Sequence, residues 1–295
     1  MRLTPVFIFS ILLLTACSAV PETDTQELTV VASTQIVGDV VSSISGEQVD
    51  VTFLIPSGTD PHAYEPTPQD AVRLTEADLI FVNGFGLEQT LQHLLVDQQA
   101  KVVNTSEGIS PLTLVEEGES GSDPHVWMNP VNVEIWADNI AQALTEADPA
   151  NAQIYRENSE AYKSEIELLD SWVADQVSQI PEENRKLVTD HESFGYFADH
   201  YGFEIVGAII PSYSTLSEPS AGELAQLEAA INQFGVKAIF VGVSLNPTLA
   251  DRIAQDTGVQ LVSIYTESLS DKDGSAHTYL EMIHFDVESI VAALK

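Results

Sequence analysis

Short apolar runs alternate with amphipathic stretches along the first half of this chain. Between 34 and 45, for example, apolar residues recur at helical spacing and Gly46 follows as a natural end. Strands are predicted at 28–33, 49–55, 78–83 and 101–104, and helices at 34–45, 68–77, 87–96 and 131–147. Because strands that alternate with helices usually form parallel βαβ units, this half predicts an α/β lobe at 28–148.

The same alternation restarts after residue 185. Strands are predicted at 186–189, 203–210, 237–241 and 260–265, and helices at 194–201, 220–234, 247–257 and 278–294. A second α/β lobe is therefore expected at 182–295. The longest break in the pattern lies in the first lobe, at 105–123, which predicts a mobile, solvated loop. Its acidic segment at 115–122 leaves a cation-collecting role open.

The stretch between the lobes predicts one long helix at 149–181. Its apolar positions recur at steps of three, four or seven and so share one face: Tyr155, Tyr162, Ile166, Leu169, Val173, Val177 and Ile180. Asp148 and Pro149 are typical of a helix start, and Pro181 ends the pattern. At 1.5 Å per residue the helix would be roughly 48 Å long, so we expect a rigid strut that joins two lobes. A long core helix within one domain is the alternative.

The N-terminus predicts a signal peptide at 1–16. Arg2 precedes a short apolar run at 6–14, which is too short to span a bilayer. Leu14-Thr15-Ala16-Cys17 resembles the lipobox of bacterial lipoproteins, which implies cleavage before Cys17 and lipidation of its thiol. Residues 17–27 would then tether the protein outside the cytoplasmic membrane, in the periplasm or at the cell surface. A plain secretory signal is the alternative.

Charge and cysteine content exclude some classes of partner. Lys and Arg number 11 and Asp and Glu 45, which gives a formal net charge of −34. Such a field repels nucleic acid and attracts cations non-specifically, although solubility alone would also explain it. We expect no nucleic-acid partner. Cys17 is the single cysteine, so an intramolecular disulfide is impossible.

A tripeptide that occurs twice, Asp-Pro-His, is the first candidate for chemistry. It occurs at Asp60-Pro61-His62 and at Asp123-Pro124-His125. Proline fixes its own φ and restricts the residue before it, so each histidine sits on a stiff turn that suits a metal ligand. A nearby carboxylate would orient the second ring nitrogen, and Asp60, Glu65, Asp123 and Glu192 are candidates either for such a role or for surface positions. Two ordinary Asp-Pro turns are the alternative.

Two further candidates follow predicted strands of the second lobe. The strand at 186–189 continues into Asp190-His191-Glu192, and the strand at 260–265 continues into Thr266-Glu267. Ligands of open α/β sheets bind beyond the carboxyl ends of the strands. Three imidazoles and one carboxylate, two from each lobe, would suit a divalent transition metal. Spacing alone does not establish that they converge.

Several segments together resemble the cluster A-I metal-binding lipoproteins, the zinc or manganese solute-binding subunits of ABC importers. They are Asp60–Pro66, Asp123–Trp127, Asp190–Phe197, Tyr265–Ser270 and Thr278–Met282. The resemblance implies two α/β lobes with mainly parallel sheets, one long rigid helix between them and a metal in the cleft. It implies the ligands His62, His125, His191 and Glu267. The family more often has aspartate at the last position. The extra methylene of Glu267 changes the reach of the carboxylate and leaves open whether it binds through one oxygen or two.

The expected function is capture of a divalent metal and its delivery to an ABC permease and its ATPase by a monomer. Three nitrogen donors and one carboxylate favour Zn²⁺ over Mn²⁺, which prefers more oxygen ligands, and manganese is the alternative. A zinc hydrolase is a rival, although neither His-Glu-x-x-His nor Gly-x-Ser-x-Gly occurs, so we expect no enzyme. An adhesin and a second metal site at His277 and His284 are weaker alternatives.

Overall fold

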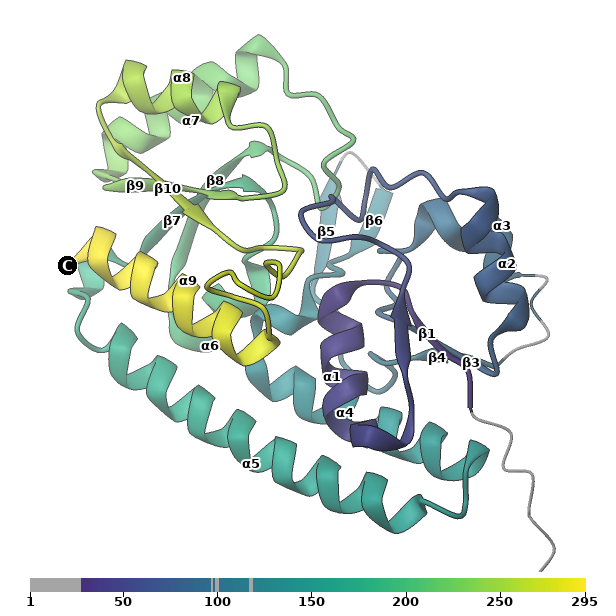
Figure 1. The fold of residues 1–295 in the computed structure, drawn as a ribbon. Coiled ribbons are helices and arrows are strands. Elements are labelled where there is room, and N and C mark those ends of the chain that lie inside the picture. The colour runs from purple at the N-terminus through teal and green to yellow at the C-terminus, as the bar shows by residue number, and fades with distance from the viewer. Residues whose placement is uncertain (1–27, 97, 99–100, 117–118) are drawn as a thin grey trace, which may run out of the picture.

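The computed structural model describes residues 28–96, 98, 101–116 and 119–295 of the chain. The predicted signal peptide, Cys17 and the tether lie outside the described residues. The described part forms two lobes, each built on a four-stranded parallel sheet, which confirms the predicted fold class (Figure 1). None of its helices has the length and apolar content needed to cross a membrane.

The two sheets have the same topology. The first has the order β2-β1-β3-β4, formed by Val51–Phe53, Val30–Ala32, Leu79–Val82 and Lys101–Asn104. The second has the order β8-β7-β9-β10, formed by Glu204–Ile210, Lys186–His191, Ala238–Gly242 and Gln260–Ile264. In each sheet the order reverses beside the first strand, and such a switch point is where open α/β sheets place ligands.

Helices cover both faces of each sheet. In the first lobe these are α1 (Gln35–Ser45), α2 (Pro68–Glu76), α3 (Gln92–Leu95) and α4 (Pro130–Ala147). In the second lobe they are α6 (Gly195–Tyr201), α7 (Ala221–Phe234), α8 (Thr248–Thr257) and α9 (Tyr279–Leu294). One large apolar core runs through both lobes on the side of α1, α4 and α9. Smaller cores lie under α2 and α3 and under α7 and α8.

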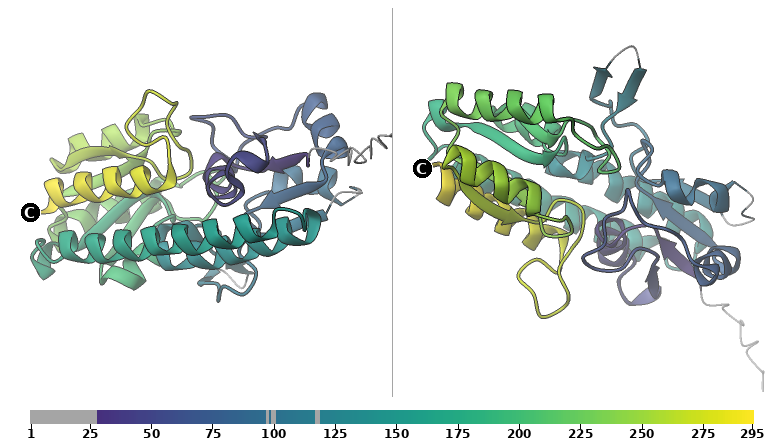
Figure 2. Two further views of the ribbon diagram at one scale, coloured as in Figure 1. Left: turned by 60° about the horizontal axis from the view of Figure 1, so that its bottom comes forward. Right: turned by 90° about the horizontal axis from the view of Figure 1, so that it is seen from above.

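Helix α5 (Ala152–Val177) extends beneath both lobes, as Figure 2 shows. It packs against α4 and α1 of the first lobe and against α9 of the second. All seven apolar side chains predicted to share a face are buried, six of them on α5 and Ile180 three residues beyond its end. Its 26 residues make it roughly 39 Å long, shorter than the predicted span.

The predicted start of the long helix was wrong. Asp148 ends α4, where its N–H donates to the Leu144 carbonyl at 2.8 Å, and Asn151 precedes the first residue of α5. The Asp148 carboxylate instead accepts the Tyr155 hydroxyl at 2.7 Å. An aspartate before a proline is as well suited to end one helix as to begin the next, because the residue before proline avoids the helical conformation.

Two further sequence predictions need correction. Residues 105–123 are not simply a loop, because β5 (Thr113–Glu116) and β6 (Glu119–Ser122) form an antiparallel hairpin that projects from the lobe (Figure 2). The helix predicted at 87–96 is reduced to a 3-10 turn at Gln89–Leu91 followed by the one-turn helix α3. The remaining predicted strands and helices are present, most of them with slightly different ends.

Candidate metal centre

The two Asp-Pro-His copies fold into the same local turn. Asp60 Oδ1 accepts the backbone N–H of His62 at 2.8 Å, and Asp123 Oδ1 accepts that of His125 at 2.9 Å. A side chain that bonds the backbone two residues on closes an Asx turn, and the intervening proline stiffens it. Each turn thereby presents its imidazole from a fixed backbone.

The second lobe presents its two candidates from strand ends. His191 is the last residue of β7, and Glu267 follows the end of β10 by three residues. Trp127, beside the second turn, donates its indole N–H to the carbonyl of Thr266 at 2.9 Å. The Tyr279 hydroxyl in turn donates to the Trp127 carbonyl at 2.7 Å. These buried bonds tie the Glu267 loop to the first lobe.

The four candidate side chains converge between the lobes. One ligand atom from each of His62, His125, His191 and Glu267 lies within 4.8 Å of the others. The Nε2 atom of His125 is 3.3 Å from that of His62 and 3.1 Å from that of His191. Glu267 Oε1 lies 2.7, 3.5 and 3.1 Å from Nε2 of His62, His125 and His191.

These separations match a tetrahedral cage for a single ion. Zinc–nitrogen and zinc–oxygen distances of about 2.0–2.1 Å place the corners of a regular tetrahedron about 3.3 Å apart. Five of the six edges, at 2.7 to 3.5 Å, bracket that length, and the sixth, between the ligand nitrogens of His62 and His191, is within 4.8 Å. The cage is also enclosed, since His125 and His191 are fully buried and Glu267 is 2 % exposed. The arrangement suits an ion that has lost most of its water.

Carboxylates orient two of the three imidazoles. Asp123 Oδ1 lies 2.8 Å from Nδ1 of His125, and Asp190 Oδ1 lies 2.7 Å from Nδ1 of His191. Such contacts fix the tautomer that leaves Nε2 free for a metal. Asp123 was among the sequence candidates for this role, but Asp190 was missed. The dipeptide Asp190-His191 at a strand end was the available signal, and the second oxygen of Asp190 accepts the N–H of Gly242 across the switch point.

The charges of the cage stabilise one another. Burial favours a raised pKa for Glu267, but the charges of His191 and His62 outweigh it and hold the pKa of that carboxyl well below its usual range. Burial favours a lowered pKa for His191, but Glu267 and Asp190 outweigh it and raise that pKa well above its usual value. The pKa of His125 is also raised, since Asp123 and Glu267 outweigh burial. The metal-free cage therefore retains protons, and a metal must displace them.

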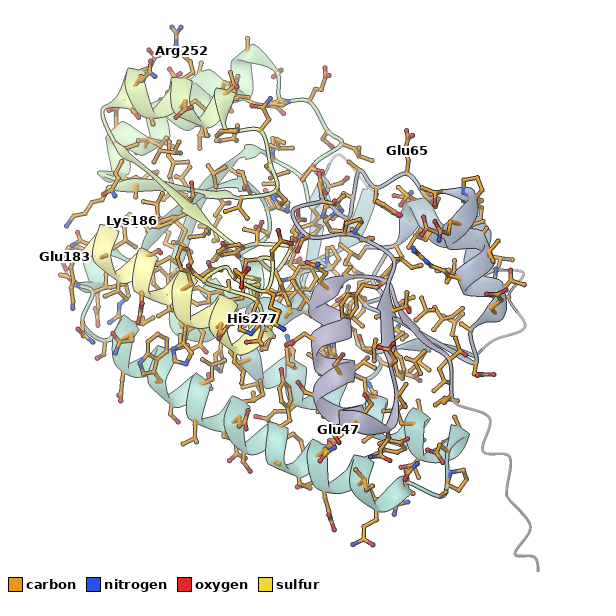
Figure 3. The ribbon with its side chains drawn as sticks, in the orientation of Figure 1. Glu47, Glu65, Glu183, Lys186, Arg252 and His277 are labelled. Atoms are coloured by element: carbon orange, nitrogen blue, oxygen red, sulfur yellow. The ribbon has the colours of Figure 1, made fainter. Side chains whose placement is uncertain are left out.

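The other residues that the sequence offered for a metal site lie away from the cage. His277 pairs with Glu281 at 2.5 Å, and the ring of His284 packs on Trp172 with centroids 4.0 Å apart. Within the described residues, three or more metal-ligating side chains converge only at the cage. Figure 3 shows Glu65 directed outward from the first lobe, and it is exposed. No second metal cluster forms around His277 within that part of the chain.

Comparison with known proteins agrees with this geometry. Residues 30–293 match the family described as zinc-uptake complex component A, periplasmic. The chain belongs to this family. The resemblance to the cluster A-I metal-binding proteins is thereby confirmed.

Two relatives of this family member are named for manganese. It is 35 % identical over 273 residues to the manganese-binding lipoprotein MntA of Halalkalibacterium halodurans, covering 92 % of this chain and 90 % of the relative. It is 32 % identical over 301 residues to the manganese ABC transporter substrate-binding lipoprotein PsaA of Streptococcus pneumoniae, covering 98 % and 97 %.

Two solved structures share its fold. The manganese-bound periplasmic metal-binding protein of Candidatus Liberibacter asiaticus has a TM-score of 0.82 and 30 % identity, covering 91 % of this chain and all of that one. The periplasmic zinc-binding protein TroA of Treponema pallidum has a TM-score of 0.83 and 30 % identity, covering 90 % and 98 %.

Proposed function

We propose that this protein captures a divalent transition metal outside the cytoplasmic membrane and delivers it to an ABC importer. The observation that carries the proposal is the convergence of His62, His125, His191 and Glu267 from both lobes. The relatives' names as substrate-binding lipoproteins of ABC transporters support the permease and ATPase as partners. Those names also agree with an extracytoplasmic location and a lipid anchor, for which Cys17 is the candidate. The protein acts as a monomer in this proposal.

The cargo proposed first is Mn²⁺, because the two relatives compared over nearly the whole sequence, MntA and PsaA, are both named for manganese. Zn²⁺ is the second candidate, since the donor set of three imidazoles and one carboxylate suits it. Divalent zinc binds a given nitrogen and oxygen site more tightly than divalent manganese. Tighter zinc binding by the purified protein is therefore expected for either cargo, and it does not identify the cargo.

Metal accumulation in cells tests the proposal and separates the two cargoes. Cells that lack this protein are grown with limiting metal, and their manganese and zinc contents are measured with and without the wild-type gene and with the His191→Ala variant. The proposal expects manganese content to depend on the wild-type gene and to stay low with the variant. Dependence of zinc alone would make zinc the cargo. Metal contents that are independent of the gene would overturn the transport proposal.

A binding role is proposed rather than catalysis. A catalytic zinc keeps one position open for water, whereas the four side chains that converge here would complete a tetrahedral shell. The buried cage also leaves little access for a substrate larger than an ion. Carbon dioxide hydration or ester hydrolysis that is abolished by His125→Ala would contradict this part of the proposal.

A further inference from the structure

The turn that carries His62 is held on both sides by the second lobe. Thr215 donates its hydroxyl to Asp60 Oδ2 at 2.5 Å, and the N–H of Gly58 donates to Ser268 Oγ at 2.7 Å. Thr215 lies between β8 and α7, and Ser268 lies after β10. Both residues of the turn belong to the first lobe by sequence, so each bond crosses the cleft.

These two bonds lie at the side of the cage that faces water. His62 is 7 % exposed, whereas His125 and His191 are fully buried. Thr215 is half-buried and Gly58 is exposed, whereas Ser268, which accepts the Gly58 N–H, is 3 % exposed. The ring of Tyr213, two residues before Thr215, has its centroid 6.5 Å from that of His125. His62 is therefore the most exposed histidine of the cage, and its turn faces the segment that carries Thr215.

Contacts on the other side of the cage are of a different kind. The bond from Trp127 to the Thr266 carbonyl and the bond from Tyr279 to the Trp127 carbonyl are both buried. Breaking a buried bond leaves an unpaired polar group without water, whereas water replaces the lost partner of a partly exposed one. The outer bonds are therefore easier to break than the inner ones. The buried bonds of Trp127 suit a hinge, about which the lobes stay in contact. The bonds of Asp60 and Gly58 to the second lobe suit a latch, which opens and closes.

We propose that Thr215 and Ser268 are positioning residues that latch the His62 turn across the cleft and thereby set the rate of metal release. This inference rests on the proposed metal-binding function. Asp60 links the latch to the ligand, because its Oδ1 accepts the His62 N–H while its Oδ2 accepts the Thr215 hydroxyl. Loss of the Thr215 bond frees the aspartate side chain, and the His62 turn then separates from the second lobe more often.

The test measures metal dissociation from loaded protein mixed with excess chelator. Thr215→Val keeps the side-chain shape and removes the hydroxyl. Ser268→Ala removes the acceptor of the Gly58 N–H together with a hydroxyl that also donates to the Leu269 carbonyl at 3.1 Å, and the double variant removes both outer bonds. One hydrogen bond fewer in the closed state should raise the dissociation rate about 2- to 10-fold for each single variant, and further for the double variant. Thr215→Ser keeps a hydroxyl and should restore the slow rate.

A matched control variant, together with the dissociation rate and the metal stoichiometry, distinguishes failure of the latch from failure of metal binding. Thr75→Val removes a threonine hydroxyl that bonds the Ala71 carbonyl in exposed α2, so its rate should equal that of the wild type. Metal stoichiometry should remain one per chain in all variants. Wild-type dissociation rates in Thr215→Val and in the double variant would overturn the latch but leave metal binding standing. Failure of the wild-type protein to bind metal would overturn the proposed function itself.

Discussion

Glu267 Oε1 lies 2.7 Å from Nε2 of His62, although one residue comes from the second lobe and the other from the first. Both side chains are buried, and the two Glu267 oxygens have no hydrogen-bond donor assigned to them apart from the imidazoles around them. A buried carboxylate is costly unless it is paired. In the metal-free protein protons on the imidazoles provide that pairing, and in the loaded protein the metal would provide it.

The carboxylate behind His125 should tune metal affinity. Asp123→Asn keeps an oxygen that accepts the ring and backbone N–H groups of His125 but removes the negative charge that makes the imidazole a stronger donor. We expect metal affinity to fall about tenfold, the lower end of the effect usual for such partners. Competition titration with a chromophoric chelator measures it.

Asp175→Asn is the control for that variant, because Asp175 is exposed on α5. Its metal affinity should equal that of the wild type. Equal affinities for the Asp123 variant and the wild type would show that the contact with His125 does not contribute to binding.

Metal affinity should fall as the pH is lowered. The raised pKa values of His125 and His191 mean that the metal-free cage holds protons which the metal must release. A raised folded pKa adds stability to the metal-free protein below the ordinary pKa, and that stability is lost as the pH rises through the folded value. Metal and protons therefore stabilise the fold at opposite ends of this pH range.

Thermal unfolding with and without metal between pH 5 and 8 checks this prediction. The rise in melting temperature caused by metal should be small at pH 5 and should grow toward pH 8. A rise that is independent of pH would contradict a cage of three imidazoles.

The carboxyl group of Asp39 should also make the stability of the fold depend on pH. Asp39 on α1 accepts the N–H of Tyr279 at the start of α9 at 2.8 Å, and burial raises its pKa from 3.8 to about 6. Between pH 3.8 and about pH 6 Asp39 is protonated more often in the folded protein than in the unfolded chain. This group therefore lowers the free energy of unfolding as the pH rises. The difference between the two pKa values corresponds to about 3 kcal/mol in the free energy of unfolding.

Denaturant unfolding of metal-free Asp39→Asn at pH 4 and pH 7 measures that contribution. The variant should lose less stability between the two pH values than the wild type does. Asp50→Asn changes an exposed aspartate and should behave as the wild type. Identical losses in the wild type and the Asp39 variant would assign the pH effect to other groups.

The inner contact between the lobes should contribute to stability. Tyr279→Phe removes the hydroxyl that donates to the buried carbonyl of Trp127 and leaves that carbonyl unpaired. The free energy of unfolding should fall by about 1–3 kcal/mol. A free energy of unfolding equal to that of the wild type would show that this inner bond does not contribute to stability.

Much of the fold was predictable because the spacing of apolar residues along the chain agrees with the faces that are buried in the folded protein. The strand at Lys101–Asn104 has the predicted bounds, and the buried face of α5 follows directly from the spacing of its apolar residues. The hairpin at Thr113–Ser122 was missed because its second strand, Glu119–Ser122, consists of residues with weak strand preference. Asp148 was assigned to the wrong helix because one aspartate suits either helix end.

The site was predictable in its residues but not in its geometry. The repeated Asp-Pro-His turns and the strand ends identify His62, His125, His191 and Glu267 as candidates. Their convergence depends on the packing of two lobes across α5, which no local pattern encodes. The contacts of Asp190 with Gly242 and of Thr215 with Asp60 are likewise long-range, so sequence spacing carried no sign of them.

Direct titration of metal-free protein with Mn²⁺ and Zn²⁺, for the wild type and for Glu267→Gln, tests the central claim. The substitution keeps the side-chain shape and removes the charge that pairs with the metal and the imidazoles. We predict one metal per wild-type chain and a loss of affinity beyond ~100-fold in the variant, since a direct ligand matters more than its outer partners. Glu288→Gln, which changes an exposed glutamate of α9, should bind as the wild type does. Unchanged affinity and stoichiometry in Glu267→Gln would contradict the four-ligand cage.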